Sequence, residues 1–301
     1  MKDASGNKFL IRRIRELSRP MTVESTGLES DIRPLKGIRA VLFDVYGTLL
    51  ISGSGDVGTA AASPSDAAMH VALTVAGCEP EPAAGPRGAE LMLQNIAAAH
   101  ARKKAAGIEF PEIAICEIWE MILARLLKER LIGLRPADAL LEPLAVEYEC
   151  RVNPVWPMPG FPEVLRELDA RIEAMGIVSN AQFYTPLAME ALSGFPVDQL
   201  GFRTDLSVYS FRAGRAKPSP QLFQQVLVPL ERNYGIAASE ALYVGNDMLN
   251  DIQTAARAGC RTALFAGDAR SLCLRNQKPA DLYPRPDLII TNLLQLPRAL
   301  A

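Results

Sequence analysis

Short apolar runs alternate with segments of helical periodicity over the second half of this chain. The expected strands lie near residues 175–179, 200–202, 241–245, 261–265 and 287–290, and helices are expected near 186–192, 219–232 and 249–258. An earlier run, residues 40–43, is also continuously apolar and ends abruptly at Asp44. Regular alternation of strands and helices predicts an α/β fold with a Rossmann-like parallel sheet core flanked by helices.

The long stretch between the first strand and the others has helical signals and almost no strand signal. Helical patterns cover residues 66–76, 88–106, 111–128 and 136–150. Four prolines and a glycine then punctuate residues 154–162, as expected at a boundary between lobes. We therefore expect an all-helical domain at residues 60–152, inserted into a core made of residues 38–59 and 153–301.

Residues 1–37 precede the first strand as an N-terminal leader. Phe9, Leu10, Ile14 and Leu17 recur at roughly helical spacing among arginines, and a loop rich in Ser, Gly and Pro follows. This spacing predicts a short amphipathic helix that docks on the rest of the chain. A partly disordered tail is the alternative, because isolated short helices are marginal in water.

Charge and cysteine content narrow the class of partner. The 301 residues contain 34 acidic and 32 basic side chains, so nothing favours a nucleic acid or an anionic membrane as the partner, and a small-molecule substrate fits better. The five cysteines are widely spaced without a C-x-x-C pair, and the first residues contain no long apolar run. We expect a cytoplasmic protein; its oligomeric state does not follow from the sequence.

Four segments place reactive side chains at or just after apolar strands. They carry Asp44, then Ser179 with Asn180, then Lys217, and finally Asp247 with Asp251. Each alone has an ordinary explanation, such as a turn former, a helix cap or a solvated lysine. Together they would gather three carboxylates, a lysine and a hydroxyl at one sheet edge, where open parallel sheets bind ligands. A divalent cation such as Mg²⁺ would relieve the repulsion, and this combination is typical of phosphoryl transfer.

In order, spacing and chemistry these segments resemble the haloacid dehalogenase superfamily, over roughly residues 38–291. The resemblance implies that Asp44 is the nucleophile of an aspartyl ester intermediate, and that Ser179 and Lys217 are catalytic. It further implies Mg²⁺ held by Asp44, the Tyr46 carbonyl, Asp247 and Asp251. Thr48 and the Asn180 backbone would contact the substrate. The inserted helices would form a cap domain, reached through a glycine-rich flap at residues 53–58.

Two departures from the family pattern leave the reaction open. Tyr46 stands where the phosphatases carry a second Asp as general acid and base, and the 2-haloacid dehalogenases share this Asp-x-Tyr-Gly-Thr pattern. Asn246 stands where many phosphatases have Asp, with Asp247 as a possible replacement ligand. Against dehalogenation, Asp247 is acidic and no arginine occurs between Asp44 and Arg87. We therefore favour Mg²⁺-dependent phosphatase-like hydrolysis, with dehalogenation and a non-catalytic phospho-ligand binding protein as alternatives.

Overall fold

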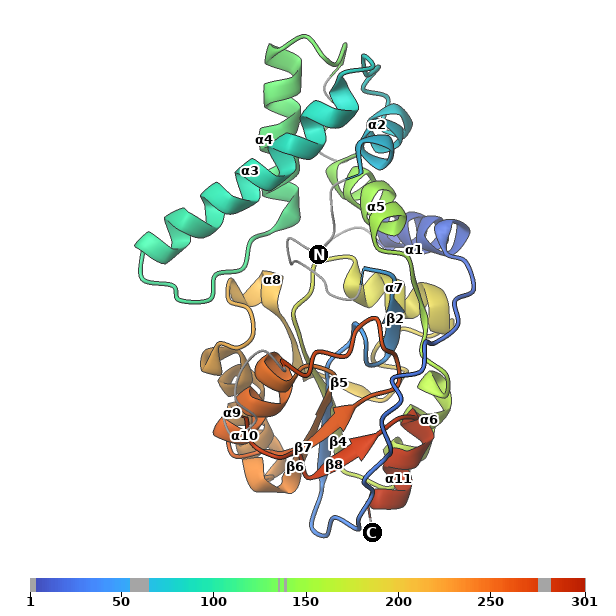
Figure 1. Ribbon diagram of the computed structural model, residues 1–301, viewed down its shortest axis with the longest axis vertical. Coiled ribbons are helices and arrows are strands. Elements are labelled where there is room, and N and C mark those ends of the chain that lie inside the picture. Colours follow the sequence, from blue (N-terminus) through green and yellow to red (C-terminus); the bar gives the residue numbers. More distant parts are fainter. Residues whose placement is uncertain (1–3, 55–64, 135, 138–139, 276–282, 301) are drawn as a thin grey trace.

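The computed structural model describes residues 4–54, 65–134, 136–137, 140–275 and 283–300. Two lobes stand one above the other, an α/β core below and a helical lobe above (Figure 1). Most of the expected flap, from residue 55 on, lies outside the described residues. In the part of the chain that is described, no helix combines the length and the apolar character needed to cross a bilayer.

The core is built on a six-stranded sheet in the order β5-β4-β1-β6-β7-β8, and neighbouring strands pair in parallel. The strands are β1 (Ala40–Phe43), β4 (Ala174–Ser179), β5 (Phe202–Tyr209), β6 (Ala241–Gly245), β7 (Arg261–Phe265) and β8 (Leu288–Ile290). The central strands are buried on both faces, which explains their continuous apolar runs. The predicted fold class is confirmed.

Helices cover both faces of this sheet (Figure 1). On one face lie α6 (Phe161–Asp169), α7 (Thr185–Ser193) and α11 (Leu296–Ala299), and on the other α9 (Pro220–Tyr234) and α10 (Thr254–Arg257). Alternate residues of β1 enter the two cores: Val41 and Phe43 belong to the first, Ala40 and Leu42 to the second. Short turns complete the core, namely α8 (Ser210–Ala213), η2 (Ala238–Glu240), η3 (Met248–Gln253) and η5 (Leu293–Gln295).

A two-stranded ribbon joins the lobes. β2 (Leu50–Ser52) carries the chain toward the upper lobe, and β3 (Val155–Pro157) brings it back, pairing antiparallel with β2. The upper lobe contains α2 (Asp66–Val75), α3 (Ala84–Ala105), α4 (Ile115–Lys128) and α5 (Leu141–Val152). These helices pack around a hydrophobic core of their own, in which the Trp119 ring is fully buried.

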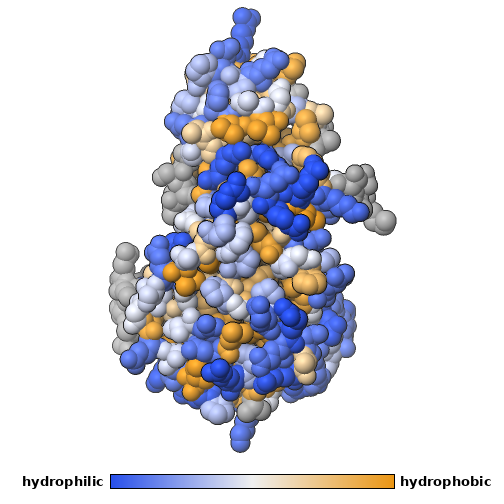
Figure 2. Space-filling model, turned by 90° about the vertical axis from the view of Figure 1, so that its right-hand side faces the viewer, coloured by the Kyte–Doolittle hydropathy of each residue, from blue (hydrophilic) through white to orange (hydrophobic). Residues whose placement is uncertain are grey.

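The leader forms a helix that bridges the lobes. α1 (Ala4–Leu17) packs against α5 above and α7 below, and buries Leu10 and Ile14 (Figure 1). Arg13 pairs with Glu147 of α5, and Arg15 Nε donates to the Ala191 carbonyl at 2.9 Å. Hydrophilic residues gather at the narrow waist on this side of the molecule (Figure 2). The amphipathic helix expected in the leader is therefore present and docked.

Candidate active site

Three charged side chains meet at the carboxyl end of the sheet. Lys217 Nζ lies 2.7 Å from Asp44 Oδ1 and 2.6 Å from Asp251 Oδ1. It also donates at 3.1 Å to the hydroxyl of Tyr243, which in turn donates to the Val178 carbonyl at 2.7 Å. The ammonium group thus donates its three protons to two carboxylates and a phenol.

Burial makes this cluster electrostatically demanding. The side chains of Lys217, Asp44 and Asp251 are only 3%, 9% and 2% exposed. Burial alone would favour a neutral amine, but the carboxylates of Asp251 and Asp44 outweigh it and raise the pKa of Lys217. Burial likewise raises the pKa of Asp251 to about 7, against the opposing effect of Lys217. Two carboxylates facing one ammonium leave an excess of negative charge in the site.

Strand ends and a glycine turn set this geometry. The Asp44 amide continues the β1 ladder by donating to the Val244 carbonyl at 2.9 Å, so its side chain leaves the sheet at the strand's end. Gly47 then turns the chain back with φ of +76°, and a Cβ there would lie 2.5 Å from the Ser271 Cβ and 2.7 Å from the Asn246 Nδ2. Any other residue would therefore meet both backbone strain and a steric clash.

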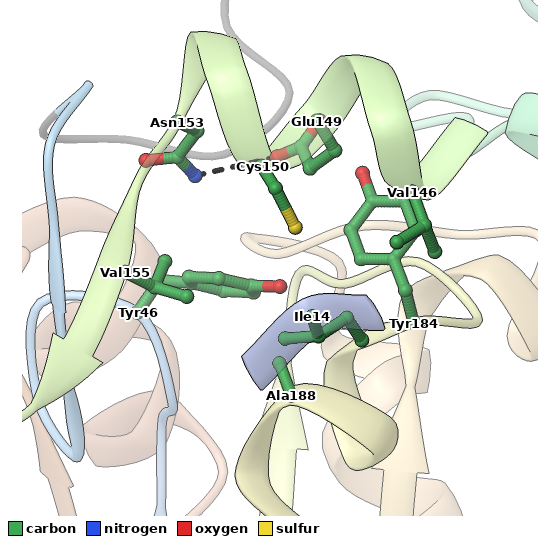
Figure 3. Close-up of a pocket in the computed structure, with 9 residues that line it drawn as sticks. All are labelled: Ile14, Tyr46, Val146, Glu149, Cys150, Asn153, Val155, Tyr184 and Ala188. Atoms are coloured by element: carbon green, nitrogen blue, oxygen red, sulfur yellow. Dashed lines mark hydrogen bonds between the residues drawn. The ribbon is translucent and has the colours of Figure 1, made fainter. Parts of the chain in front are cut away.

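The surroundings of the Tyr46 hydroxyl do not favour a role in acid–base catalysis. The residue is 6% exposed, and its hydroxyl lies 2.9 Å from the Thr185 Oγ1 at the start of α7. Burial, with the charge of Glu149 as the next cause, raises the pKa of Tyr46. The ring lines a small cavity that Glu149, Cys150 and Tyr184 also line, with room for about one water molecule (Figure 3). A phenol with a raised pKa holds its proton at neutral pH.

The side chains that were predicted to contact the substrate mostly form hydrogen bonds with other residues of the site. Asn180 Oδ1 accepts from the Lys217 backbone N–H at 2.7 Å, and its Nδ2 donates to the Lys217 carbonyl at 3.4 Å. Thr48 Oγ1 donates to Asn246 Oδ1 at 3.1 Å. Ser179 is fully buried at the end of β4, and its hydroxyl has a contact of 3.3 Å with the Asn180 carbonyl. Asn180 therefore fixes the backbone of Lys217.

Asp247 starts the helical turn that carries Asp251. Its Oδ1 accepts from the backbone N–H groups of Leu249 at 2.8 Å and Asn250 at 3.1 Å, as an N-cap does. Arg275 holds the same carboxylate with Nε at 3.1 Å from Oδ1 and with Nη2 on Oδ2. The Asp247 backbone N–H donates to Asp251 Oδ2 at 2.9 Å. Asp247 thus supports Asp251 through its backbone, while its carboxylate is used by the cap and the guanidinium.

A family model of haloacid dehalogenase-like hydrolases matches residues 38–259, most of the chain. The chain belongs to the haloacid dehalogenase-like hydrolases. Among solved structures it is similar to a 2-haloacid dehalogenase from Pseudomonas syringae pv. tomato, at 21% identity and a TM-score of 0.57, covering 87% of this chain and 97% of that one. It is also similar to a HAD phosphatase from Thermococcus onnurineus, at 19% identity and a TM-score of 0.46, with coverages of 87% and 97%. No curated protein sequence matches it.

The likeness to the Pseudomonas syringae structure supports the fold of this haloacid dehalogenase-like hydrolase and leaves its substrate open. The comparison with the Pseudomonas syringae enzyme covers most of both chains, so the shared architecture includes the core and the helical insertion. An identity near one fifth is too low to transfer a reaction. The choice between phosphate and halide chemistry must therefore come from the geometry of its own site.

The Mg²⁺ site predicted from the sequence does not fit as a four-ligand set. The carboxylate of Asp247 is already satisfied by five donor contacts from Leu249, Asn250 and Arg275. Within the described residues, no group of three or more His, Cys, Asp or Glu side chains is arranged to hold a metal ion. Asp44 and Asp251 remain as a pair of carboxylates joined by Lys217, so a cation there would need further oxygen ligands from solvent or substrate.

Three residues contribute contacts to the site of this haloacid dehalogenase-like hydrolase that were not predicted from the sequence. Tyr243 reads as one more apolar position of β6, although a buried tyrosine needs a partner for its hydroxyl. Asn246 was treated as a departure from a ligand pattern, whereas its side chain joins Thr48 to the Ser271 carbonyl, the latter at 2.5 Å. Arg275 lies in a loop 28 residues after Asp247, and the residues around each of them form no sequence pattern that predicts their contact.

Proposed function

We propose that this hydrolase forms a covalent ester on Asp44 and releases a leaving group that needs no proton. The observation that carries the proposal is the pairing of a buried nucleophile with an unreactive neighbour. Asp44 is held by Lys217 through Oδ1, while Tyr46, at the position of a general acid, is buried, bonded to Thr185 and has a raised pKa. An alkoxide leaving group requires an acid in its departure, whereas a halide does not.

Within that class we propose hydrolysis of the carbon–halogen bond of a small 2-haloacid. One carboxylate oxygen of Asp44 attacks the carbon that bears the halogen, an ester bond forms, and the halide leaves with the bonding electron pair. Water then adds to the ester carbonyl to give a tetrahedral adduct. Collapse of this adduct releases a 2-hydroxy acid and a proton and restores the Asp44 carboxylate. Lys217 screens the negative charge as substrate approaches.

Two features of the sequence argued against this reaction, and the surroundings of Asp247 weaken the first of them. An acidic Asp247 had argued against dehalogenation, but its charge is matched by Arg275 and its oxygens are engaged. The missing arginine after Asp44 still has to be replaced as the receptor of the substrate carboxylate. Ser179 and the Asn180 N–H, at the adjacent strand end, are the groups we assign to that task. The Lys217 ammonium adds positive charge nearby while its protons stay on Asp44, Asp251 and Tyr243.

A second candidate, Mg²⁺-dependent hydrolysis of an aryl or acyl phosphate, is favoured by one observation. Asp44 and Asp251 put two buried carboxylates against one ammonium, and burial raises the pKa of Asp251 to about 7. Asp44 and Asp251 are the side chains that would hold the ion, which would neutralise phosphoryl oxygens. These substrates also have leaving groups that depart as stable anions, so Tyr46 is no obstacle.

Parallel assays separate these candidates. Halide release from 2-chloropropionate and hydrolysis of p-nitrophenyl phosphate are measured with EDTA and with added Mg²⁺, using Asp44→Asn as the control. Halide release that EDTA leaves unchanged supports the proposal, whereas phosphate hydrolysis that requires Mg²⁺ supports the second candidate. No turnover of either compound, with p-nitrophenyl phosphate still bound, would identify a non-catalytic binding protein.

The covalent step has its own test. In a single turnover with enzyme in excess in heavy-oxygen water, an ester on Asp44 sends its carboxylate oxygen into the product. The peptide that contains Asp44 then gains the heavy oxygen, which mass spectrometry detects. Label that enters the product directly, with an unlabelled Asp44 peptide, would show direct attack by water and would contradict the nucleophile assignment.

A further inference from the structure

A loop of the helical lobe is bound to the core segment that leads into Lys217. Residues 106–114 connect α3 with α4, and residues 210–216 run from the end of β5 to the catalytic lysine. The Ala216 N–H donates to the Phe110 carbonyl at 2.9 Å, and the Glu112 N–H donates to the Gly214 carbonyl at 3.1 Å. The two segments thus meet through their backbones one residue before Lys217.

The carboxylate of Glu112 enters the core at this contact. Ser210 Oγ donates to Glu112 Oε2 at 2.7 Å and accepts from the Ala181 backbone N–H at 2.8 Å. Ser210 is fully buried. Ala181 directly follows Asn180, whose side chain bonds both backbone groups of Lys217. A chain of hydrogen bonds therefore runs from a carboxylate of the helical lobe to the catalytic lysine.

The next residue of the same core loop is bound by the helical lobe as well. Gln182 Nε2 donates to the Ile113 carbonyl at 2.8 Å, and Gln182 Oε1 accepts from the Ile115 N–H at 3.0 Å. Its amide also contacts Glu112 Oε1 at 3.4 Å. Ala181 and Gln182 therefore both depend on the position of the segment that carries Glu112.

Simple packing between lobes would not favour a carboxylate here. Removing a carboxylate from water is costly unless hydrogen bonds replace the lost solvation. Burial raises the pKa of Glu112, and the hydroxyl of Ser210 and the Ile113 N–H oppose that effect. Lys103 Nζ donates to the backbone carbonyl of Glu112 at 2.5 Å. The donor that the core offers to this carboxylate is a hydroxyl that also holds the loop after Asn180.

We propose that Glu112 is a positioning residue of the active site. Carried by the helical lobe, it orders the loop of residues 180–182 through Ser210, and this loop orders the backbone of Lys217. Docking of the helical lobe and assembly of the catalytic cluster are then a single event. An undocked lobe leaves Lys217 less well placed between Asp44 and Asp251, so the enzyme is fully competent only with the lobe docked.

Hydrogen exchange of the full-length chain tests the coupling without any substrate. The variants are Glu112→Ala and Ser210→Ala, and Glu109→Gln, an exposed glutamate of the same loop, is the matched control. In both variants we expect faster exchange in the peptides that cover residues 180–184 and 214–218. The exchange of these peptides should be unchanged in the control variant, and the exchange of β7 should be unchanged in all three variants. Unchanged exchange in these peptides for Glu112→Ala would overturn the proposal. Ser210→Ala provides the same test should Glu112→Ala fail to fold.

The kinetic test rests on the proposed function and is read separately. For whichever substrate is turned over, Glu112→Ala lowers kcat about 10- to 100-fold and changes KM by less than about threefold, since a charge-assisted hydrogen bond is lost outside the substrate site. Glu112→Gln, which keeps an acceptor for Ser210, recovers part of kcat. The double variant with Ser210→Ala is no slower than the slower single variant.

Failures of the two proposals are distinguishable. Additive losses in the double variant, or a kcat equal to that of Glu109→Gln, contradict the role of Glu112 while leaving the reaction established. An inactive wild-type chain whose exchange at residues 180–184 still responds to Glu112→Ala contradicts the proposed function and supports the positioning role.

Discussion

Lys217 donates a hydrogen bond of 2.7 Å to Asp44, although 173 positions separate the two residues in the chain. The contact joins the loop before α9 to the end of β1, and the same ammonium group reaches Asp251 after β6. One lysine therefore fixes the relative positions of three segments and neutralises part of their charge. This dual role makes it the most informative residue for separating stability from catalysis.

Replacing Lys217 by Met should damage both properties. The change leaves Asp44 and Asp251 buried without their cation, and breaking a buried pair costs about 3–5 kcal/mol of unfolding free energy. Turnover should fall about 100-fold or more, because a charge aimed at the reacting groups is lost. Urea denaturation and initial rates measure the two effects. Lys36→Met, at an exposed lysine, serves as the control and should resemble wild type; equal stability of the two variants would contradict the buried ion pair.

Tyr46→Phe distinguishes a packing role from an acid–base role. The change removes the hydrogen bond to Thr185 and should cost about 1 kcal/mol of unfolding free energy. Turnover should stay within about threefold of wild type, because a phenol that keeps its proton contributes no acid–base catalysis. Tyr243→Phe is the informative comparison, since its hydroxyl contacts Lys217 and its loss should slow turnover more. A large and pH-dependent loss in Tyr46→Phe would restore a catalytic role to this hydroxyl.

Much of the core could be predicted because its signals are local. Continuous apolar runs gave five of the six sheet strands within about a residue, and parallel strands must deliver Asp44, Ser179 and Asp251 to one edge. β5 was placed too early: it begins at Phe202 and extends to Tyr209, with exposed polar residues that weaken its apolar pattern. The three-residue strands β2 and β3 were missed because segments this short carry no periodicity.

The roles of the acidic residues in the fourth segment could not be predicted. From the family resemblance we expected both Asp247 and Asp251 to hold Mg²⁺. Asp247 instead lies before the first turn and uses its carboxylate as a cap, so the two side chains take different surroundings. The deciding partner of Asp247 is Arg275, which a loop brings from another part of the chain. Such a tertiary contact leaves no trace in the local pattern.

Arg275→Gln should loosen the start of the turn that carries Asp251. The guanidinium is lost from Asp247, whose N–H and cap hold this turn in place, and we expect about 1–3 kcal/mol less unfolding free energy. Turnover should fall about 10-fold, as Asp251 and Lys217 lose alignment. Thermal melts and initial rates measure the two effects, and Arg270→Gln, in the same loop but paired with Asp268, is the control for the rates. Equal rates for both variants would limit Arg275 to a local structural role.

The pair of Arg13 and Glu147 should make docking of α1 sensitive to acid. Burial favours the protonated form of Glu147, yet hydrogen bonds from Arg13 and Arg151 outweigh it and hold the pKa of Glu147 below its ordinary value of 4.5. A carboxylate with a lowered pKa contributes stability above the pKa of the unfolded chain, and that contribution is lost as the pH falls through the folded value. Glu147→Gln should therefore cost about 1 kcal/mol at pH near 7 and progressively less in acid.

Urea denaturation of wild type and Glu147→Gln across this pH range measures the difference directly. Glu120→Gln, at an exposed carboxylate of α4, should stay close to wild type throughout. Proteolysis after α1 provides a local readout, because a released helix exposes the segment that follows Leu17 to cleavage. Faster cleavage in Glu147→Gln at neutral pH, converging with wild type in acid, is the expected pattern. A stability gap that widens as the pH falls would show that the ion pair does not hold α1 between the two lobes.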